Sequence, residues 1–248
     1  MSPTGCLRLL AALLLLTGCG TSPPAETAVG PVSPVTPATT TPAESAGAVT
    51  SDPPAPRAQA SRFSATVRPV GAADLPASWR PGCPIGPEEL RMVTLSHWGF
   101  DDVQHEGVLV VNASAVQPMI DVFRRLFEAR FPIRRMQPID GFGGSDEAST
   151  EADNTSAFNC RNAVAAGPPH WSMHAYGLAI DVNPVENPYL LGGDVLPPSG
   201  SAYLGRSPYR PGMAVEGGVL TSAFAAVGWS WGGTWASPDF QHFSSTGS

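Results

Sequence analysis

The prolines of this chain divide it into a part that cannot form a core and a part that can. Nine prolines fall between residues 20 and 62, among small and polar residues and without an aromatic side chain. Such a stretch buries too little apolar surface to offset its ordering entropy, so we expect it to stay extended. The first aromatic residue after it is Phe63, and all six tryptophans follow. We therefore predict one folded domain over residues 63–248.

The residues before this stretch have the pattern of an export signal. Arg8 precedes a run of leucines and alanines that ends at Leu16, and Leu16-Thr17-Gly18-Cys19 is similar to a bacterial lipobox. We predict a lipoprotein signal peptide over 1–18, lipidation of Cys19, and a tether over 19–62. At about 3.1 Å per residue the tether could reach on the order of 130 Å. Plain secretion is the alternative.

This pattern places the domain outside the cytoplasm, held to the outer face of the bacterial membrane and reaching the cell wall. The composition also limits the classes of molecule that the protein can bind. The net charge is −7 and only 14% of residues are charged. Because no basic stripe is present to hold phosphates, nucleic acid is excluded as a partner. Nothing in the sequence indicates a protein partner.

The folded part mixes short alternating runs with two helical patterns. Because strands and helices do not alternate regularly, the pattern favours the α+β class. The acidic residues between 146 and 153 lack the spacing of a calcium-binding loop and are expected in a solvated loop. Strands are predicted at 63–67, 92–95, 108–111, 133–139, 178–183, 229–231 and 240–243, and helices at 113–130 and 219–227.

Two cysteines, Cys83 and Cys160, remain in the exported part. An even pair outside the cytoplasm is most simply a disulfide. Closing so long a loop could contribute roughly 4 kcal/mol to stability. A thiolate acting as zinc ligand or nucleophile is the alternative, but no CxxC spacing accompanies either residue.

Chemically useful residues gather in two short segments. Residues 172–181 read Ser-Met-His-Ala-Tyr-Gly-Leu-Ala-Ile-Asp, and residues 239–242 read Asp-Phe-Gln-His. Two imidazoles and one carboxylate, from His174, His242 and Asp181, would bind zinc and leave a fourth position for water. From residue types alone, a structural His–Asp pair is the other interpretation. Four tryptophans flank these segments and either line a cleft or belong to the core.

The order and spacing of these residues carry a resemblance to a known family. SxHxxGxAxD followed by DxxH resembles the zinc peptidases of peptidoglycan. These are the D-alanyl-D-alanine carboxypeptidases, the D-Ala-D-Ala dipeptidases and the L-alanyl-D-glutamate endopeptidases. The resemblance includes the segment from Asn154 to Arg161 and covers roughly residues 80–245.

The resemblance implies a role for each matching residue. His174, Asp181 and His242 match the zinc ligands, and Asp239 matches the general base that takes a proton from water. Arg161 matches the arginine that binds substrate or the developing oxyanion, and Ser172 matches a polar residue ahead of the first ligand. The implied fold has a central antiparallel sheet with flanking helices, as in hedgehog signalling domains and lysostaphin-type peptidases.

The activity that the resemblance implies is zinc-dependent hydrolysis of a peptide bond in the stem peptide of peptidoglycan. D-Ala-D-Ala carboxypeptidase is the first choice, because an arginine fork such as that of Arg161 can bind a terminal carboxylate in two places. An L-Ala-D-Glu endopeptidase is the second choice. A wall-binding module without catalysis is the alternative of another class.

Overall fold

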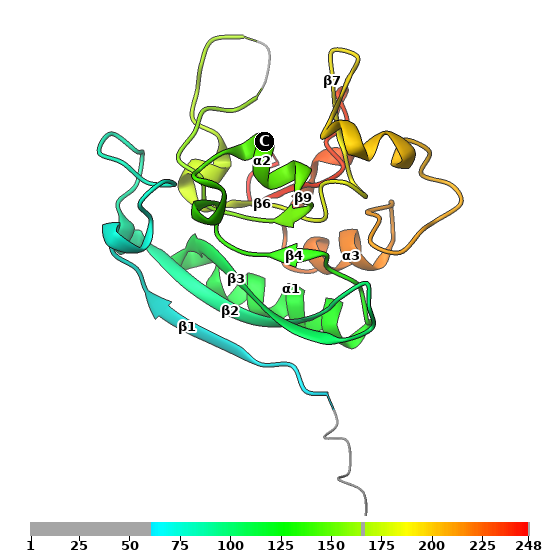
Figure 1. The fold of residues 1–248 in the computed structure, drawn as a ribbon, viewed down its shortest axis with the longest axis horizontal. Coiled ribbons are helices and arrows are strands. Elements are labelled where there is room, and N and C mark those ends of the chain that lie inside the picture. Colours follow the sequence, from blue (N-terminus) through cyan, green and yellow to red (C-terminus); the bar gives the residue numbers. More distant parts are fainter. Residues whose placement is uncertain (1–60, 165–166, 248) are drawn as a thin grey trace, which may run out of the picture. The chain divides into compact units, whose positions relative to one another are not determined.

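A computed structural model describes residues 61–164 and 167–247. The predicted signal peptide, Cys19 and nearly all of the predicted tether lie outside these residues. Among the described residues, no helix has both the length and the apolar character needed to cross a bilayer. The described part mixes antiparallel sheets with a few helices, which confirms the predicted α+β class (Figure 1).

The first sheet forms the base of the molecule in Figure 1. It contains β1 (Ala65–Pro69), β2 (Leu90–Trp98) and β3 (Gln104–Asn112), antiparallel and in that order. Val93 at the centre of β2 faces Val67 on one neighbour and Leu109 on the other. These strands confirm the predictions for 63–67, 92–95 and 108–111.

Helix α1 (Val116–Glu128) packs against β2 and supplies much of the core. A 3-10 turn, Ala113–Ala115, leads into it, and the Asn112 side chain caps this turn by accepting a hydrogen bond from Ser114 N at 3.0 Å. The apolar spacing that predicted the helix places one face in the core. Its buried residues are Met119, Val122, Phe123, Leu126 and Phe127.

The second sheet carries the chemically interesting strands. It contains β6 (Ala179–Asp181), β10 (His242–Ser244) and β9 (Ser230–Trp231), with β10 in the middle. Helix α3 (Val219–Ala225) covers it, and the Phe224 ring stacks on Phe243 with centroids 4.0 Å apart. The strands thus divide between two antiparallel sheets, where the sequence predicted one central sheet.

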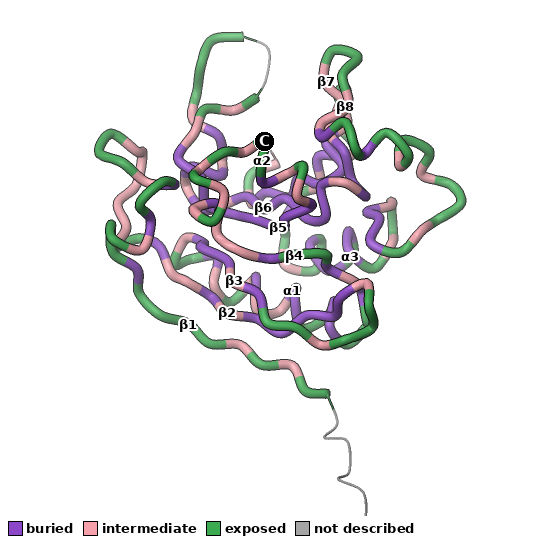
Figure 2. The backbone as a smooth tube through the Cα atoms, in the orientation of Figure 1, coloured by how far each residue is buried: buried purple, intermediate pink, exposed green. Residues whose placement is uncertain are grey.

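One hydrophobic core joins the two sheets. Leu95 and Leu109 of the first sheet belong to the same buried cluster as Ile180 and Phe243 of the second. Figure 2 shows buried segments in both sheets, interrupted in β2 and β3 by half-buried residues. The second sheet is thereby fixed on the first, and the polar residues of β6 and β10 stand on a rigid support.

Two further pairs of short strands complete the fold. β4 (Arg135–Met136) pairs in parallel with β5 (Asn154–Thr155). The strand predicted over 133–139 is therefore much shorter, because Pro138 has no N–H for the ladder and a 3-10 turn follows it. β7 (Tyr189–Leu191) and β8 (Asp194–Leu196) form a hairpin.

The acidic stretch after residue 145 forms helix α2 (Asp146–Glu151), so the prediction of a solvated loop is wrong. The Ser145 hydroxyl caps this helix by accepting a hydrogen bond from Ala148 N at 3.1 Å. Short 3-10 helices connect the other elements. They span Ala72–Asp74, Pro87–Glu89, Ala113–Ala115, Ile139–Phe142, Met173–Tyr176, Pro198–Tyr203 and Gly232–Thr234.

Candidate metal centre

His174 is placed by a short 3-10 helix, Met173–Tyr176, that leads into β6. Ser172 caps this helix, since its hydroxyl accepts a hydrogen bond from His174 N at 3.3 Å. Gly177 ends the helix with a φ of +64°. A Cβ at this position would lie 2.6 Å from Asn112 N, so both the backbone conformation and the space require glycine.

Asp181 and His242 are placed by strand pairing. They stand directly opposite each other in the antiparallel register of β6 and β10. Side chains of directly opposite residues lie on the same face of a sheet. Because Ile180 and Phe243 face the core on the other side, the register turns the carboxylate and the imidazole toward His174.

The three side chains converge on one point. His174 Nε2 lies 3.1 Å from one Asp181 carboxylate oxygen, and His242 Nδ1 lies 3.2 Å from the other. The two ring nitrogens are 3.3 Å apart, and one ligand atom from each residue falls within 4.8 Å of the others. All three residues are buried, with exposed fractions of 3 to 7%.

The hydrogen bonding around the imidazoles fits a shared cation. His174 Nδ1 lies 2.6 Å from the carbonyl oxygen of Ala157, which can only accept, so Nδ1 donates to it and Nε2 is the nitrogen that faces Asp181 and His242. One possible ligand atom from each of the three residues therefore faces the others in a buried place. Two neutral imidazoles and a carboxylate are ligands that zinc prefers, and a carbonyl behind a ligating histidine is a common support.

Electrostatics agrees with this geometry. Burial alone would raise the pKa of Asp181, but the adjacent imidazoles of His174 and His242 outweigh it. They hold the pKa of this carboxyl well below its ordinary value. Asp181 is thus an anion in the folded protein, as a metal ligand must be.

Asp239 lies beside this cluster and is 8% exposed. Its Oδ1 is buried and has no hydrogen-bond partner among the described residues. Burial and the nearby charge of Asp181 raise the pKa of Asp239 to about 7, although His242, Arg161 and Gln241 act in the opposite direction. A carboxyl group in this state is suited to exchange protons near neutral pH.

A cleft of about 800 Å³ opens onto the three candidate ligands and Asp239. Ser172 and Arg161 line it, together with apolar residues of the β7–β8 hairpin. Arg161 is fixed by an ion pair from its Nε to the Asp146 carboxylate at 2.8 Å. Its Nη1 also donates to the Asn162 carbonyl at 3.2 Å. The structure therefore brings all predicted site residues of the folded part to one cleft.

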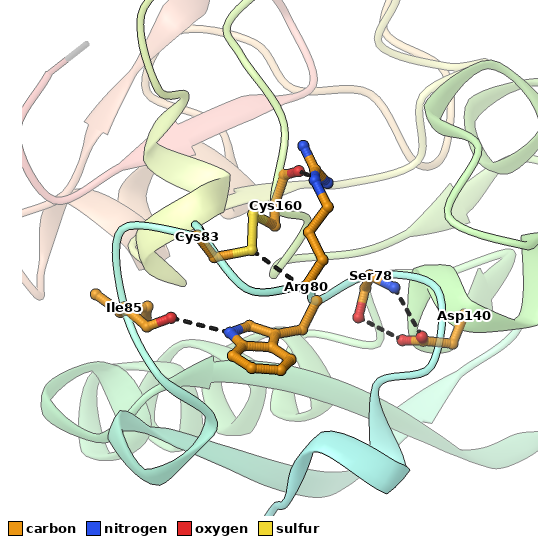
Figure 3. Close-up of a disulfide and its surroundings, with 7 residues drawn as sticks. Ser78, Arg80, Cys83, Ile85, Asp140 and Cys160 are labelled. Carbon is orange, nitrogen blue, oxygen red and sulfur yellow. Dashed lines mark hydrogen bonds between the residues drawn. A yellow bond between two sulfur atoms is a disulfide. The ribbon is translucent and has the colours of Figure 1, made fainter.

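The predicted disulfide between Cys83 and Cys160 is present, with the two Cα atoms 5.8 Å apart (Figure 3). It attaches the residue before Arg161 to the loop that follows β1. Arg80 donates to the Cys160 carbonyl at 2.7 Å, and Cys160 N donates to the Ser78 carbonyl at 3.0 Å. The bridge thus fixes the segment that carries Arg161 in the cleft wall. It also leaves neither thiol free to act as a ligand.

Sequence reasoning missed three parts of the site. Asp146, which orients Arg161, lies on a helix that was not predicted. Gln241 is 5% exposed, and its Oε1 lines the cleft without a partner among the described residues. The β7–β8 hairpin turns at Gly192-Gly193, both with positive φ. A Gly-Gly pair between apolar residues is a recognised hairpin signal and could have revealed this wall.

Two imidazoles and a carboxylate at the base of a cleft, with a buried acid beside them, define a candidate mononuclear metallohydrolase. Residues 166–245 match the family model described as D-alanyl-D-alanine carboxypeptidase. The match confirms the predicted resemblance to the peptidoglycan peptidases, and it spans the three candidate ligands and Asp239. No curated protein and no solved structure matched the chain.

Proposed function

We propose that this protein is a zinc-dependent peptidase that hydrolyses the terminal D-Ala-D-Ala bond of the peptidoglycan stem peptide. The observation that carries the proposal is the convergence of His174, Asp181 and His242 within 4.8 Å of one another at the base of a cleft. The match of 166–245 to a carboxypeptidase family supports the reaction type.

The three convergent side chains would hold the zinc ion. Zinc, when bound, supplies a Lewis acid that activates water and polarises a peptide carbonyl. Asp181 contributes the negative charge of the ligand set, and the Ala157 carbonyl keeps the His174 ring in the required orientation. All three residues are buried and line the cleft, so their side chains are held in place while the site stays open to substrate.

Asp239 serves as the proton carrier. Its Oδ1 has no partner among the described residues, so it is free to accept a proton from the attacking water. A pKa raised to about 7 by burial and by Asp181 lets the same group pass the proton to the leaving amine. Gln241 lines the same cleft and acts against burial to lower the pKa of this carboxyl.

Arg161 supplies the positive charge in the cleft. Asp146 lies against its Nε, and Nη1 gives one hydrogen bond to the Asn162 carbonyl, so the remaining Nη1 and Nη2 hydrogens form the edge available to a substrate oxygen. A terminal carboxylate or the developing oxyanion would fit this edge. The ion pair with Asp146 partly neutralises the charge of Arg161, which weakens its attraction for a terminal carboxylate. This observation favours the second candidate, an L-Ala-D-Glu endopeptidase, because that enzyme binds no terminal carboxylate.

The proposal extends to the fold and the location. We propose that the domain shares the fold of hedgehog-type and lysostaphin-type peptidases, on the strength of the same ligand order and an antiparallel sheet that carries two of the ligands. The lipobox-like residues ending at Cys19 support attachment to the outer face of the membrane. The proline-rich residues that follow would then allow the domain to reach the cell wall.

Mass spectrometry of defined muropeptides tests the proposed reaction. The zinc-loaded full chain is incubated with a pentapeptide substrate that ends in D-Ala-D-Ala and with the corresponding tetrapeptide. Release of one D-alanine from the pentapeptide alone is the expected result. Cleavage of both substrates between L-Ala and D-Glu would establish the endopeptidase instead.

His174→Ala provides the matched control, since two remaining ligands hold zinc poorly and turnover should disappear together with the metal. His170→Ala is the second control, because His170 is exposed on the rim of the same cleft and is not part of the cluster. Stoichiometric zinc in the wild type without cleavage of any stem peptide would refute catalysis and support a wall-binding module.

A further inference from the structure

A second groove lies beside the catalytic cleft and is not used by the proposed reaction. It measures about 520 Å³ and is formed by α3, β9 and the residues that flank them. Among its lining residues are Glu216, Ser222, Ala225, Trp229, Trp231 and Trp235. Three tryptophans in one small groove are a large share of the six in the chain.

The groove and the catalytic cleft share one wall. Trp235 lines both cavities, and its ring centroid lies 5.2 Å from that of His242. The Trp235 indole is therefore part of the wall between the groove and the candidate metal centre. A ligand long enough to pass around Trp235 could occupy both places at once.

The hydrogen bonding of the indole N–H groups indicates that this surface can bind a polar ligand. Trp79, Trp98 and Trp231 each donate to a backbone carbonyl at 2.8 to 3.0 Å. Within the described residues, the other three tryptophans have no such acceptor. These three are Trp171, which lines the cleft, Trp229, which lines the groove, and Trp235, which lines both.

Trp229 is the most informative of the three because it is only 7% exposed. Its N–H is not among the buried polar atoms that lack a partner, so this donor is accessible from the groove. Here its ring packs against Phe224 while the side chain also lines the groove. A ligand in the groove that carries an acceptor oxygen could therefore accept a hydrogen bond from this accessible donor.

The rim of the groove offers further polar groups. The side chains of Glu216, Ser222 and Ser230 are exposed, and they form no hydrogen bond or ion pair with other described residues. A carboxylate and two hydroxyls therefore line the same groove as the three indoles. The negative charge of Glu216 disfavours an anionic ligand and favours one that donates hydroxyl hydrogens.

We propose that this groove binds a pyranose ring of a polysaccharide, in particular a sugar of the glycan strand that carries the stem peptide. A pyranose presents an apolar C–H face that packs on an indole ring, and hydroxyls that exchange hydrogen bonds with carboxylate, hydroxyl and indole N–H groups. This inference rests on the proposed function, because a substrate joined to a glycan explains why a sugar groove adjoins a peptidase cleft.

The test blocks the groove from an exposed helix position. Ala225 lies on the exposed surface of α3 and lines the groove, whereas Ala226 is exposed beside it and does not line the groove. Ala225→Arg should fill the groove, and Ala226→Arg adds the same charge outside it. The probe is N-acetylchitotetraose, a soluble and peptide-free sugar, titrated into the full chain by calorimetry and by NMR of the tryptophan side chains.

We expect the wild type and Ala226→Arg to bind the tetrasaccharide with perturbation of the Trp229 and Trp235 indole signals. Binding by Ala225→Arg should be weaker by about tenfold or more, equivalent to about 1.4 kcal/mol. If circular dichroism shows that Ala225→Arg fails to fold, Glu216→Gln replaces it, with a smaller loss expected. No binding by the wild type, or equal binding by Ala225→Arg and the wild type, would overturn the proposal.

A kinetic readout separates this proposal from the proposed function. The ratio of kcat/KM for a glycan-linked peptide to that for the free peptide should fall about tenfold in Ala225→Arg and stay unchanged in Ala226→Arg. Sugar binding without peptide hydrolysis would support the groove and refute the peptidase. Hydrolysis of both substrates with a ratio that Ala225→Arg does not alter would refute the groove and leave the peptidase intact.

Discussion

Glu186 gives the sharpest prediction for the stability of the fold. This residue is 2% exposed, and its Oε2 has no hydrogen-bond partner among the described residues. Asp153, itself 6% exposed, lies beside it. Arg134 contacts both carboxylates only at 3.4 and 3.6 Å. Burial and the adjacent Asp153 together raise the pKa of Glu186 from 4.5 to about 8.

A raised pKa of a carboxyl group makes stability fall as the pH rises. Below pH 4.5 the folded and the unfolded chain both hold the proton, so the group has no effect on their balance. Between pH 4.5 and about 8 the unfolded chain releases the proton while the folded chain keeps it. The free energy of unfolding then decreases by at most about 1.4 kcal/mol per pH unit. The total is on the order of 5 kcal/mol.

Glu186→Gln removes this titration and keeps the shape of the side chain. The variant should match the wild type near pH 5 within about 1 kcal/mol and exceed it by several kcal/mol near pH 9. Urea unfolding, followed by tryptophan fluorescence from pH 5 to 9 with a chelator present, measures the difference. Asp239 is unchanged in both proteins, so its own titration cancels in the comparison.

Glu128→Gln is the matched control, since Glu128 is exposed at the end of α1. The free energy of unfolding of Glu128→Gln should differ from that of the wild type by a nearly constant amount over the same pH range. If Glu186→Gln also showed a constant difference from pH 5 to 9, the raised pKa and the reasoning built on burial beside Asp153 would be refuted.

Three further substitutions test separate parts of the structure. Cys83→Ser opens a bridge across 77 residues and should lower the free energy of unfolding by about 4 kcal/mol in urea titrations; equal stability with and without reductant would contradict this. In Gly177→Ala the alanine must adopt a positive φ, and its Cβ would lie 2.6 Å from Asn112 N. Calorimetry should therefore show a loss of about 2 kcal/mol or more in the free energy of unfolding. Asp239→Asn should retain stoichiometric zinc by elemental analysis while kcat falls about a hundredfold or more. Loss of zinc in that variant would make Asp239 a ligand.

The sequence predicts those parts of the site that depend on local order. Alternation at Leu178, Ile180 and Val182 identifies a strand, and Gly177 before it identifies a turn. The meeting of His174, Asp181 and His242 is predicted by the resemblance of their spacing to the zinc peptidases, and the pairing of β6 with β10 in the structure aligns Asp181 with His242. Helix α1 is predictable for the same reason, since its apolar period is local.

Other features depend on contacts between segments that are distant in the sequence. The ion pair of Arg161 with Asp146 requires α2, and a six-residue helix has too little periodicity to be recognised. The buried Gln241 and the pair formed by Glu186 and Asp153 appear only when several elements pack together. The position of Trp235 between two cavities is likewise a property of the assembled fold.

Zinc K-edge X-ray absorption of the zinc-loaded protein tests the central claim most directly. The account predicts one zinc per chain with nitrogen and oxygen ligands at about 2.0–2.2 Å, including the multiple-scattering signature of two imidazoles. His174→Ala should reduce that signature to one imidazole or abolish zinc binding. A sulfur ligand near 2.3 Å, or an absorption spectrum that His174→Ala leaves unchanged, would contradict the assignment of His174, Asp181 and His242 as the metal centre.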